Sequence, residues 1–572
     1  MELLYNACIH TLDPARPAAS ALVIDGGRVV AVGGEELLAE FDHAGRNDMG
    51  GRIILPGLTD AHIHLQEYAI SLQAVDCEVE TKGEILDRVA ERIRQTPPGE
   101  WVRGHGWNQN TWGGEWPTAA DLEAVAPENP VCLTAKSLHV SWANSTALQL
   151  AGITASTPDP ANGQIQRDAH GNPTGLLFEE AMKLVAEAIP EPRPETLAKT
   201  FQQLIPALFR MGLTGVHDFD KRTCFQALQI LHERGELRLR VVKSIPLELL
   251  PQAAELGLRS GFGDDILRIG SVKLFADGAL GPHTGAMFEA YVDDPQNRGI
   301  LILNGEQFFE HGRLAVENGL SLAVHAIGDR AVHEVLEGFT LLRAYEREQG
   351  LPVLRHRIEH VQTIHPEDAG RLGELELIAS MQPVHAPSDM FMADRLLGER
   401  AAFSYAWRTQ LQHGTRLAFG SDAPVENPDP FHGLHAAVTR CRADGFPGPD
   451  GWFPEQRLTV HEALTGFTLG PAYAAGMDDR LGRLSTGFLA DLIVVETDPF
   501  TCDPAEIYAI QPVATMVGGE WVWQAGGSID EHTIDSRRFG APFGRAPREE
   551  RSHHRGGFAE GSGLSEGKAS SR

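Results

Sequence analysis

Cysteine is scarce in this sequence. Six cysteines are spread over 572 residues, and none of them forms a C-x-x-C pair. Disulfide frameworks and zinc ribbons both depend on closely spaced cysteines, so neither is predicted here. We expect the six residues to be buried thiols.

Long apolar runs are also missing. No uninterrupted stretch approaches the roughly 20 apolar residues that a membrane-spanning helix needs. The chain starts with MELLYN, which lacks the order of basic, apolar and small residues that marks a signal peptide. The sequence therefore predicts a cytoplasmic protein with no membrane partner.

Basic residues are outnumbered by acidic ones. The chain has 49 Lys and Arg against 78 Asp and Glu, a formal net charge of -29. An acidic surface of this size repels phosphate backbones, so no nucleic-acid partner is expected. The one basic stretch, residues 537–572, is rich in Gly, Ser and Arg and has no apolar period. Such a composition cannot offset its ordering entropy, and residues 529–572 are predicted to be a disordered tail.

The chain is too long for one compact core, but it suits a barrel of about 250 to 400 residues with a smaller satellite domain. Near the start, two β-branched runs flank Asp25-Gly26-Gly27, a strong hairpin signal. A similar pattern surrounds Gly518-Gly519 near the other end. Each β region is too small to stand alone, so we predict that residues 1–50 and 479–528 form one small β-sandwich.

Between these ends, β-rich runs alternate with helical stretches, as in βα units around a parallel sheet. Eight candidate strands predict an α/β protein with a (β/α)8 TIM-like barrel over residues 51–478, interrupted by an insertion at about 66–200. The candidate strands are residues 53–64, 214–217, 239–242, 269–273, 322–325, 357–360, 378–381 and 416–419.

The sharpest local motif is LPGLTDAHIH, which ends in His62 and His64. Residues two apart on a strand point the same way, so both imidazoles can bind one metal ion. An H-x-H pair alone is a weak signal, because the chain has 24 histidines. Its place at the end of the first candidate strand strengthens it, since barrel enzymes build their sites at the carboxyl ends of the strands.

Later strands end in further candidate ligands. His325 closes the fifth strand, His360 closes the sixth, and Asp422 follows the eighth. Each taken alone is more readily explained as a core histidine or a helix-capping aspartate, but the recurrence favours a metal centre. Lys273 ends the fourth strand, where burial favours a neutral amine that can react with carbon dioxide to give a bridging carbamate. The alternative is a lysine paired with an aspartate such as Asp277.

Six candidate ligands in strand order resemble the metal centre of the amidohydrolase superfamily: His62, His64, Lys273, His325, His360 and Asp422. The segments VKLFADG, VHAIGDRA and RIEH are similar to the amidohydrolase family 3 branch, which contains N-substituted formamide deformylase. The resemblance spans roughly residues 3–525.

The resemblance implies one or two divalent ions, with zinc expected, and carbon dioxide bound as a carbamate on Lys273. Two groups would hold the ions, with His62, His64 and Asp422 on the first and His325 and His360 on the second. Water held between the ions would attack the substrate carbonyl, and Asp422 would pass the proton to the departing amine. The implied reaction is hydrolysis of a C–N bond in an amide or N-substituted formamide.

Further residues are candidates for substrate contact. Aromatic and histidine side chains in the insertion suit an amide-bearing ligand, and residues after barrel strands lie at the expected mouth. Packing explains the insertion residues equally well. The candidates are His105, Trp107, His139, Asp277, Arg330, Gln382 and His385, with weaker support for His217 and Asp218.

Several alternatives stay open on the sequence alone. A mononuclear deaminase or a cyclic-imide hydrolase could use the same barrel, and in the deaminase Lys273 would stay uncarboxylated. A non-catalytic scaffold is a different class, which metal-free protein without hydrolytic activity would favour. The same barrel also hosts decarboxylases and isomerases. The expected partner is a small amide-like molecule, and a homo-oligomer is compatible with the sequence.

Overall fold

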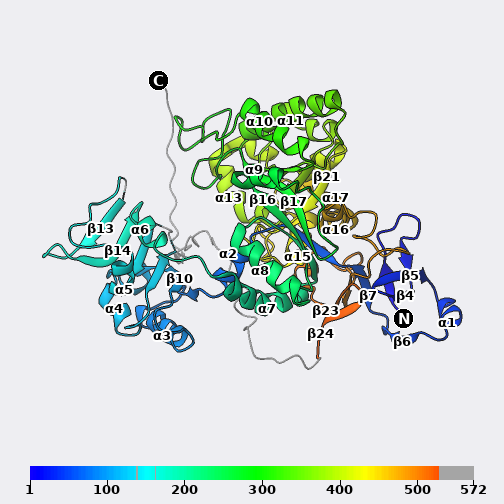
Figure 1. Ribbon diagram of the computed structural model, residues 1–572, viewed down its shortest axis with the longest axis horizontal. Coiled ribbons are helices and arrows are strands. Elements are labelled where there is room, and N and C mark those ends of the chain that lie inside the picture. The colour runs from blue at the N-terminus through cyan, green and yellow to red at the C-terminus, as the bar shows by residue number, and fades with distance from the viewer. Residues whose placement is uncertain (137–138, 162, 527–572) are drawn as a thin grey trace, which may run out of the picture.

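The protein is organised around an eight-stranded parallel sheet (Figure 1). The computed structural model describes residues 1–136, 139–161 and 163–526. Each strand of the sheet pairs with the next one along the chain, which confirms the predicted (β/α)8 barrel. The strands are β8 (Leu58–Ile63), β15 (Leu213–Asp218), β16 (Arg240–Pro246), β17 (Leu267–Phe275), β18 (Leu322–Ala326), β19 (Arg357–His360), β20 (Ile378–Met381) and β21 (Arg416–Phe419).

The first and last strands meet and close the barrel. The backbone N–H of Asp422, just after β21, donates to the carbonyl of His62 in β8 at 2.7 Å. The buried Asp60 carboxylate joins the same strands, because it accepts from Ser421 N–H at 3.1 Å and from Ser421 Oγ at 2.5 Å. Side chains that follow successive strands therefore face one common mouth.

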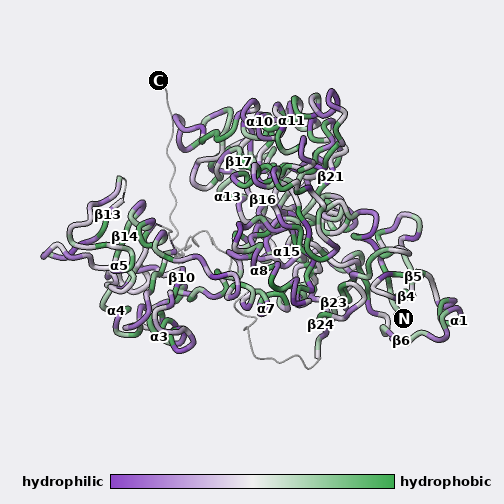
Figure 2. The backbone as a smooth tube through the Cα atoms, in the orientation of Figure 1, coloured by the Kyte–Doolittle hydropathy of each residue, from purple (hydrophilic) through white to green (hydrophobic). Residues whose placement is uncertain are grey.

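Amphipathic helices surround the sheet. Helix α7 (Pro194–Arg210) begins with proline, which pre-sets the helical φ, and its buried residues recur every three or four positions. Green and purple alternate along α7 in Figure 2. The other helices around the barrel are α2 (Leu65–Ser71), α8 (Arg222–Glu233), α9 (Leu250–Glu255), α10 (Gly305–Glu317), α11 (Asp329–Gln349), α12 (Arg371–Glu374), α13 (His385–Leu397), α14 (Trp407–Gln412), α15 (Pro430–Thr439), α16 (Val460–Phe467) and α17 (Leu469–Ala474).

Two further sheets fit the predicted β-sandwich, and one of them combines strands from both ends of the chain. Both predicted hairpins are present, β4–β5 and β23–β24. Ile24 from the N-terminal region and Met516 from the C-terminal region lie in one buried cluster. One sheet holds β5 (Arg28–Gly33), β4 (Ala21–Asp25), β1 (Glu2–Tyr5) and β6 (Gly45–Asp48), and the other holds β24 (Glu520–Gln524), β23 (Pro512–Val517), β22 (Leu492–Val495), β7 (Ile53–Pro56), β2 (Cys8–His10) and β3 (Ala18–Ala19).

The predicted first barrel strand, residues 53–64, is in fact two strands. β7 belongs to the sandwich, where it pairs with β2 and β22, whereas β8 starts the barrel. The chain changes sheets at Gly57, where a Cβ atom would lie 2.5 Å from the Thr214 side chain. Apolar residues continue across the break, so hydrophobicity alone predicts one strand.

The insertion after α2 forms a sheet with its own core, to one side of the barrel (Figure 1, cyan). Helices α3 (Lys82–Ile93), α4 (Ala119–Glu123), α5 (Ser145–Leu150) and α6 (Met182–Ala186) accompany it. In sheet order its strands are β13 (Gly163–Arg167), β14 (Pro173–Glu179), β12 (Val140–Ala143), β11 (Val131–Ala135), β10 (Val102–Trp107) and β9 (Val75–Asp76).

The cysteine prediction holds for four residues and is wrong for two. Cys8 is exposed and Cys502 is half-buried. Cys8 lies on β2, a strand with only one fully buried residue, so its side chain faces outward. The predicted tail, 529–572, lies outside the described residues. Within the described part of the chain, every helix is too short or too polar to span a bilayer.

Candidate metal centre at the mouth of the barrel

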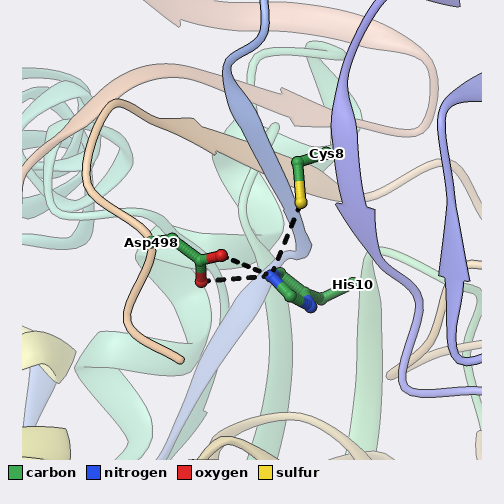
Figure 3. Close-up of side chains that lie close together, drawn as sticks. All are labelled: Cys8, His10 and Asp498. Atoms are coloured by element: carbon green, nitrogen blue, oxygen red, sulfur yellow. Dashed lines mark hydrogen bonds and ion pairs between the residues drawn. The ribbon is translucent and has the colours of Figure 1, made fainter. Parts of the chain in front are cut away.

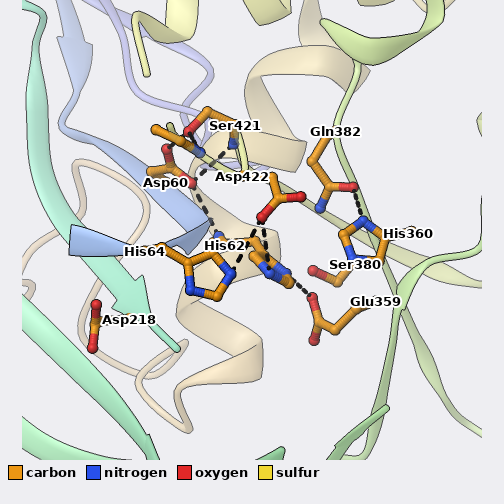
Figure 4. A network of polar contacts seen from close by, with 12 residues as sticks. Asp60, His62, His64, Asp218, Glu359, His360, Ser380, Gln382, Ser421 and Asp422 are labelled. Atoms are coloured by element: carbon orange, nitrogen blue, oxygen red, sulfur yellow. Dashed lines mark hydrogen bonds and ion pairs between the residues drawn. The ribbon is translucent and has the colours of Figure 1, made fainter. Parts of the chain in front are cut away.

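The four predicted histidine ligands lie in one cluster at the carboxyl end of the barrel. Ring centroids are 5.7 Å apart for His62 and His64, 5.0 Å for His62 and His360, and 4.6 Å for His325 and His360. Figure 4 shows Asp422 among His62, His64 and His360. The structure thus brings together side chains from strands one, five, six and eight.

Asp422 faces both histidines of the H-x-H motif. Its Oδ1 lies 3.4 Å from His62 Nε2 and 3.5 Å from His64 Nε2. Asp422 has a φ of +61° and His360 a φ of +74°. Such left-handed backbone is uncommon outside glycine and concentrates at functional sites.

A buried ion-pair network fixes the His62 ring. Its Nδ1 donates to Glu359 Oε2 at 2.6 Å. Arg357 forms an ion pair with Glu359 and donates to Ser380 Oγ at 2.5 Å. Burial would raise the pKa of Glu359, but the charges of Arg357 and Lys273 outweigh it and lower that pKa. The ionised carboxylate therefore orients Nε2 of His62 toward Asp422 (Figure 4).

A second carboxylate orients the His64 ring. The His64 Nδ1 donates to Asp220 Oδ1 at 3.0 Å. Asp220 follows β15, and the same carboxylate accepts from Gln66 N–H at 2.5 Å. Nearby, Asp218 forms a buried ion pair with Lys243 at 2.9 Å. Both histidines of the motif thus hold a carboxylate on Nδ1 and present Nε2 to Asp422.

The donor set fits a divalent metal ion. His62 Nε2 is buried without a hydrogen-bond partner among the described residues. Donor atoms of His62, His360 and Asp422 all lie within 4.8 Å of one another. Burial holds the pKa values of His62 and His360 well below normal, which leaves neutral imidazoles that can bind metal. Two imidazoles and a carboxylate are typical zinc ligands.

His325 and His360 are also fixed through one ring nitrogen each. His360 Nδ1 donates to Gln382 Oε1 at 2.8 Å, and His325 Nε2 donates to Gly278 O at 2.9 Å. The remaining nitrogens, Nε2 of His360 and Nδ1 of His325, are left for an ion. Gln382, predicted to contact substrate, thus positions a candidate ligand.

Lys273 is buried between aromatic rings. Its Nζ lies 4.6 Å from the ring centroid of Phe219 and 4.9 Å from that of Phe275. Burial lowers the pKa of Lys273 to about 8. More of the amine is therefore neutral at pH 7 than in an ordinary lysine, and the neutral amine is the form that reacts with carbon dioxide.

Asp277 anchors two loops. Its carboxylate accepts from the N–H groups of Ala286 at 2.8 Å, Ile327 at 3.0 Å and Gly328 at 2.8 Å. Burial raises the pKa of Asp277 to about 7. These contacts give Asp277 a structural task and argue against the alternative in which it pairs with Lys273.

The remaining candidates after barrel strands lie at the same mouth. His385 Nε2 donates to the carbonyl of Ser421 at 3.2 Å, beside Asp422. Arg330 lies in the first turn of α11, where its N–H donates to Ala286 O at 3.1 Å. His217 accepts from Arg357 Nη1 at 2.9 Å and so supports the network around Glu359.

The three candidates in the insertion are not part of this cluster. Trp107 is fully buried, donates from Nε1 to Leu133 O at 2.9 Å and lies against Trp142. The indole belongs to the insertion core, and its contact with substrate stays a prediction. His139 is exposed and pairs with Glu179 at 2.9 Å. His105 lies on β10 of the same sheet.

Sequence reasoning missed the residues that orient the ligands. Glu359 directly precedes His360, and Asp220 lies two residues after Asp218 at the end of β15. A carboxylate beside a candidate ligand or a strand end is the signal that could have revealed both. The sequence around Glu359 or Asp220 does not indicate which histidine ring the carboxylate contacts in the fold.

Comparison with known proteins identifies the family. The sequence model of the Amidohydrolase family matches residues 47–523, most of the chain. The chain belongs to the amidohydrolase family. The predicted resemblance is therefore confirmed, and the protein is a hydrolase acting on C–N bonds.

Individual relatives of this amidohydrolase are similar over nearly their whole length. Protein LONG AFTER FAR-RED 3 of Arabidopsis thaliana is 32% identical over 91% of each chain. N-substituted formamide deformylase of Arthrobacter pascens is 29% identical over 92% of this chain and 99% of its own. The solved structure of an uncharacterised metal-dependent hydrolase from Pyrococcus furiosus covers 87% of this chain and 100% of its own, with 30% identity and a TM-score of 0.75.

Proposed function

We propose that this amidohydrolase cleaves the C–N bond of an amide, with N-substituted formamides as the first substrate class to test. The observation that carries the proposal is the approach of Asp422 Oδ1 to Nε2 of both His62 and His64. A carboxylate near two oriented imidazoles suits activation of water beside a metal ion. The 29% identity to N-substituted formamide deformylase supports this substrate class.

Zinc is the proposed metal, since imidazole and carboxylate donors suit it. A zinc ion at this position would acidify water and polarise the substrate carbonyl. Asp422 would accept the proton of the attacking water at Oδ1 and deliver it to the departing amine nitrogen. Burial raises the pKa of Asp422, which suits a group that both accepts and donates a proton.

Lys273 decides whether the centre holds one ion or two. We propose that its neutral amine attacks carbon dioxide and loses a proton, and that the resulting carbamate would serve as a further anionic ligand for a second ion. His62, His64 and Asp422 would then serve one ion, and His325 and His360 the other. His385 and Arg330 remain the candidates for substrate contact at the mouth.

Metal analysis and a substrate screen test the proposal together. The purified protein is expected to hold one or two zinc equivalents at the barrel and to hydrolyse at least one N-substituted formamide faster than the matching acetamide or cyclic imide. Activity only on a cyclic imide would replace the formamide class. A metal-free protein inactive on the whole panel would favour a non-catalytic scaffold.

Replacing Asp422 with Asn tests the proton transfer. Asn keeps the shape of the side chain but cannot accept the proton, so kcat should fall by about 10²- to 10⁴-fold. The metal content of D422N is measured by elemental mass spectrometry. A wild-type metal content would show that the fall in kcat does not result from loss of the metal. Near-normal turnover in D422N would remove Asp422 from this role.

A further inference from the structure

A second cluster of metal-binding side chains lies in the β-sandwich, outside the barrel (Figure 3). His10 Nε2 is 3.1 Å from both carboxylate oxygens of Asp498 and 3.9 Å from Cys8 Sγ. Donor atoms of the three residues all lie within 4.8 Å of one another. The sequence predicts Cys8 only as a buried thiol, and the barrel chemistry does not use it.

The sheet brings these distant residues together. Cys8 and His10 are two apart on β2 and so lie on the same face. Cys8 and Val495 both pair with Ile53, from opposite sides of β7. After β22 the chain therefore crosses the end of β7, and this places Asp498 beside β2.

The surroundings hold two of the side chains in place. The His10 ring stacks on Phe500 with 4.2 Å between centroids. The Asp498 Oδ1 accepts from Phe500 N–H at 2.9 Å. Relative side-chain exposure is 20% for His10 and 15% for Asp498, whereas Cys8 is open to solvent. The cluster is thus ordered on one side and accessible from the other.

The geometry favours chelation over a proton relay. In a Cys–His–Asp relay, the carboxylate and the thiol must occupy opposite ring nitrogens. Here both groups approach the same nitrogen, His10 Nε2. Three donors that converge on one point are the arrangement that a metal ion needs.

We propose that Cys8, His10 and Asp498 form a zinc site separate from the barrel centre, with water as the fourth ligand. Tetrahedral zinc with ordinary bond lengths spaces a histidine nitrogen about 3.3 Å from a carboxylate oxygen and about 3.6 Å from a thiolate sulfur. The observed 3.1 and 3.9 Å need only small shifts to match. Bound zinc displaces the thiol proton and links the first and last parts of the sandwich through three side chains.

Among the described residues, a second cluster of possible metal ligands that contains a cysteine is not equivalent. Asp218, Asp220 and Cys224 also have donor atoms within 4.8 Å of one another, but all three are buried. Lys243 already supplies a positive charge there, with Nζ 2.9 Å from Asp218 Oδ2. Burial also raises the pKa of the Cys224 thiol far above normal.

Cobalt substitution of the full-length protein tests the site. The candidate ligands of the barrel centre include no sulfur, so a near-ultraviolet charge-transfer band from thiolate to cobalt reports on cysteine alone. The wild-type protein should bind one more cobalt equivalent than Cys8→Ser and show the band, which C8S should lack. Cys502→Ser is the matched control, because Cys502 is the other partly accessible cysteine and should leave band and stoichiometry unchanged.

Thiol alkylation gives a second measurement on the same proteins. The rate of Cys8 alkylation is measured by peptide mass spectrometry. Zinc should slow this alkylation at least tenfold in the wild type, and it should not slow it in His10→Gln. Equal cobalt stoichiometry in wild type and C8S, loss of the band in C502S instead, or alkylation of Cys8 at one rate with and without zinc would each overturn the proposal.

Discussion

Glu359 and His62 form the shortest contact that orients a candidate ligand. The 2.6 Å hydrogen bond fixes the ring and directs Nε2 into the site. Glu359→Gln removes the negative charge but keeps the size of the side chain. Because carboxylates of this kind support metal binding, we expect the zinc affinity of the barrel site to fall about 10- to 100-fold in a chelator competition assay.

Glu367→Gln is the control for that experiment, since Glu367 is exposed and lies outside the network. It should leave the zinc affinity unchanged. Circular dichroism must show that E359Q is folded, because Arg357 loses its charged partner. Wild-type affinity in folded E359Q would contradict an orienting role for this carboxylate.

The amine of Lys273 should respond to pH. Its pKa of about 8 lies below that of an ordinary lysine, so it is mostly protonated at pH 7 and mostly neutral at pH 9. Only the neutral amine forms a carbamate. With ¹³C-bicarbonate, the carbamate signal in the carbon NMR spectrum of metal-free protein should therefore increase from pH 7 to pH 9. Lys273→Arg should give no such signal, and a wild-type spectrum without it would leave the centre mononuclear.

At the scale of residues, the sequence was informative where a ligand ends a strand. The H-x-H pair, His325, His360 and Asp422 could all be found this way, because strand ends of a barrel share one mouth. The residues that orient these ligands could not be found in this way. Glu359 is 297 residues from His62, and only the closed barrel places them together.

The contact between β21 and β8 leaves no room for a side chain at Gly420. A Cβ atom there would lie 2.4 Å from His62 N and 2.6 Å from Asp60 Oδ1. Gly420→Ala should push the two strands apart and lower the free energy of unfolding by about 1 to 3 kcal/mol. Denaturant unfolding measures the change.

Gly83→Ala is the matched control for Gly420→Ala. The Cβ of a residue at position 83 would meet only Thr81 Oγ1, at 3.9 Å, within helix α3. Alanine favours helix over glycine, so G83A should be neutral or slightly stabilising. Equal effects of the two substitutions on the free energy of unfolding would show that the contact between β21 and β8 tolerates a methyl group.

At the scale of elements, strand positions followed from β-branched runs and turn residues. All eight barrel strands lie where the pattern predicted them, apart from the division of residues 53–64 into β7 and β8. That division is set by tertiary pairing. Both halves are buried and apolar, and only the close approach to Thr214 at Gly57 separates them.

A buried ion pair connects the barrel with the C-terminal part of the sandwich. Arg240 of β16 donates from Nε and Nη2 to the carboxylate of Asp491 at 2.6 and 2.7 Å. Arg240→Met leaves Asp491 as an unpaired buried charge, so the free energy of unfolding should fall by about 3 to 5 kcal/mol. Arg313→Gln, which breaks an exposed pair on α10, should change the melting temperature little. Similar melting temperatures for the two variants would argue against a structural role for the Arg240 pair.

At the scale of the whole molecule, the union of both chain ends could be predicted because neither β region has enough strands alone. The position of the insertion relative to the barrel could not be predicted. Its aromatic residues suggested a substrate wall, but Trp107 and Trp142 fill a separate core. Composition does not distinguish an aromatic residue that lines a pocket from one that packs inside a domain.

The central position of β7 in a sheet shared by both ends has a consequence for synthesis. β7 is complete at residue 56, but its neighbour β22 starts at residue 492. At about 5 to 20 residues per second, the ribosome needs roughly 20 to 90 s to make the intervening chain. During that interval one edge of β7 has no partner, which is a template for wrong pairing. The early strands of the sandwich therefore stay open to wrong pairing until the C-terminal strands have been made.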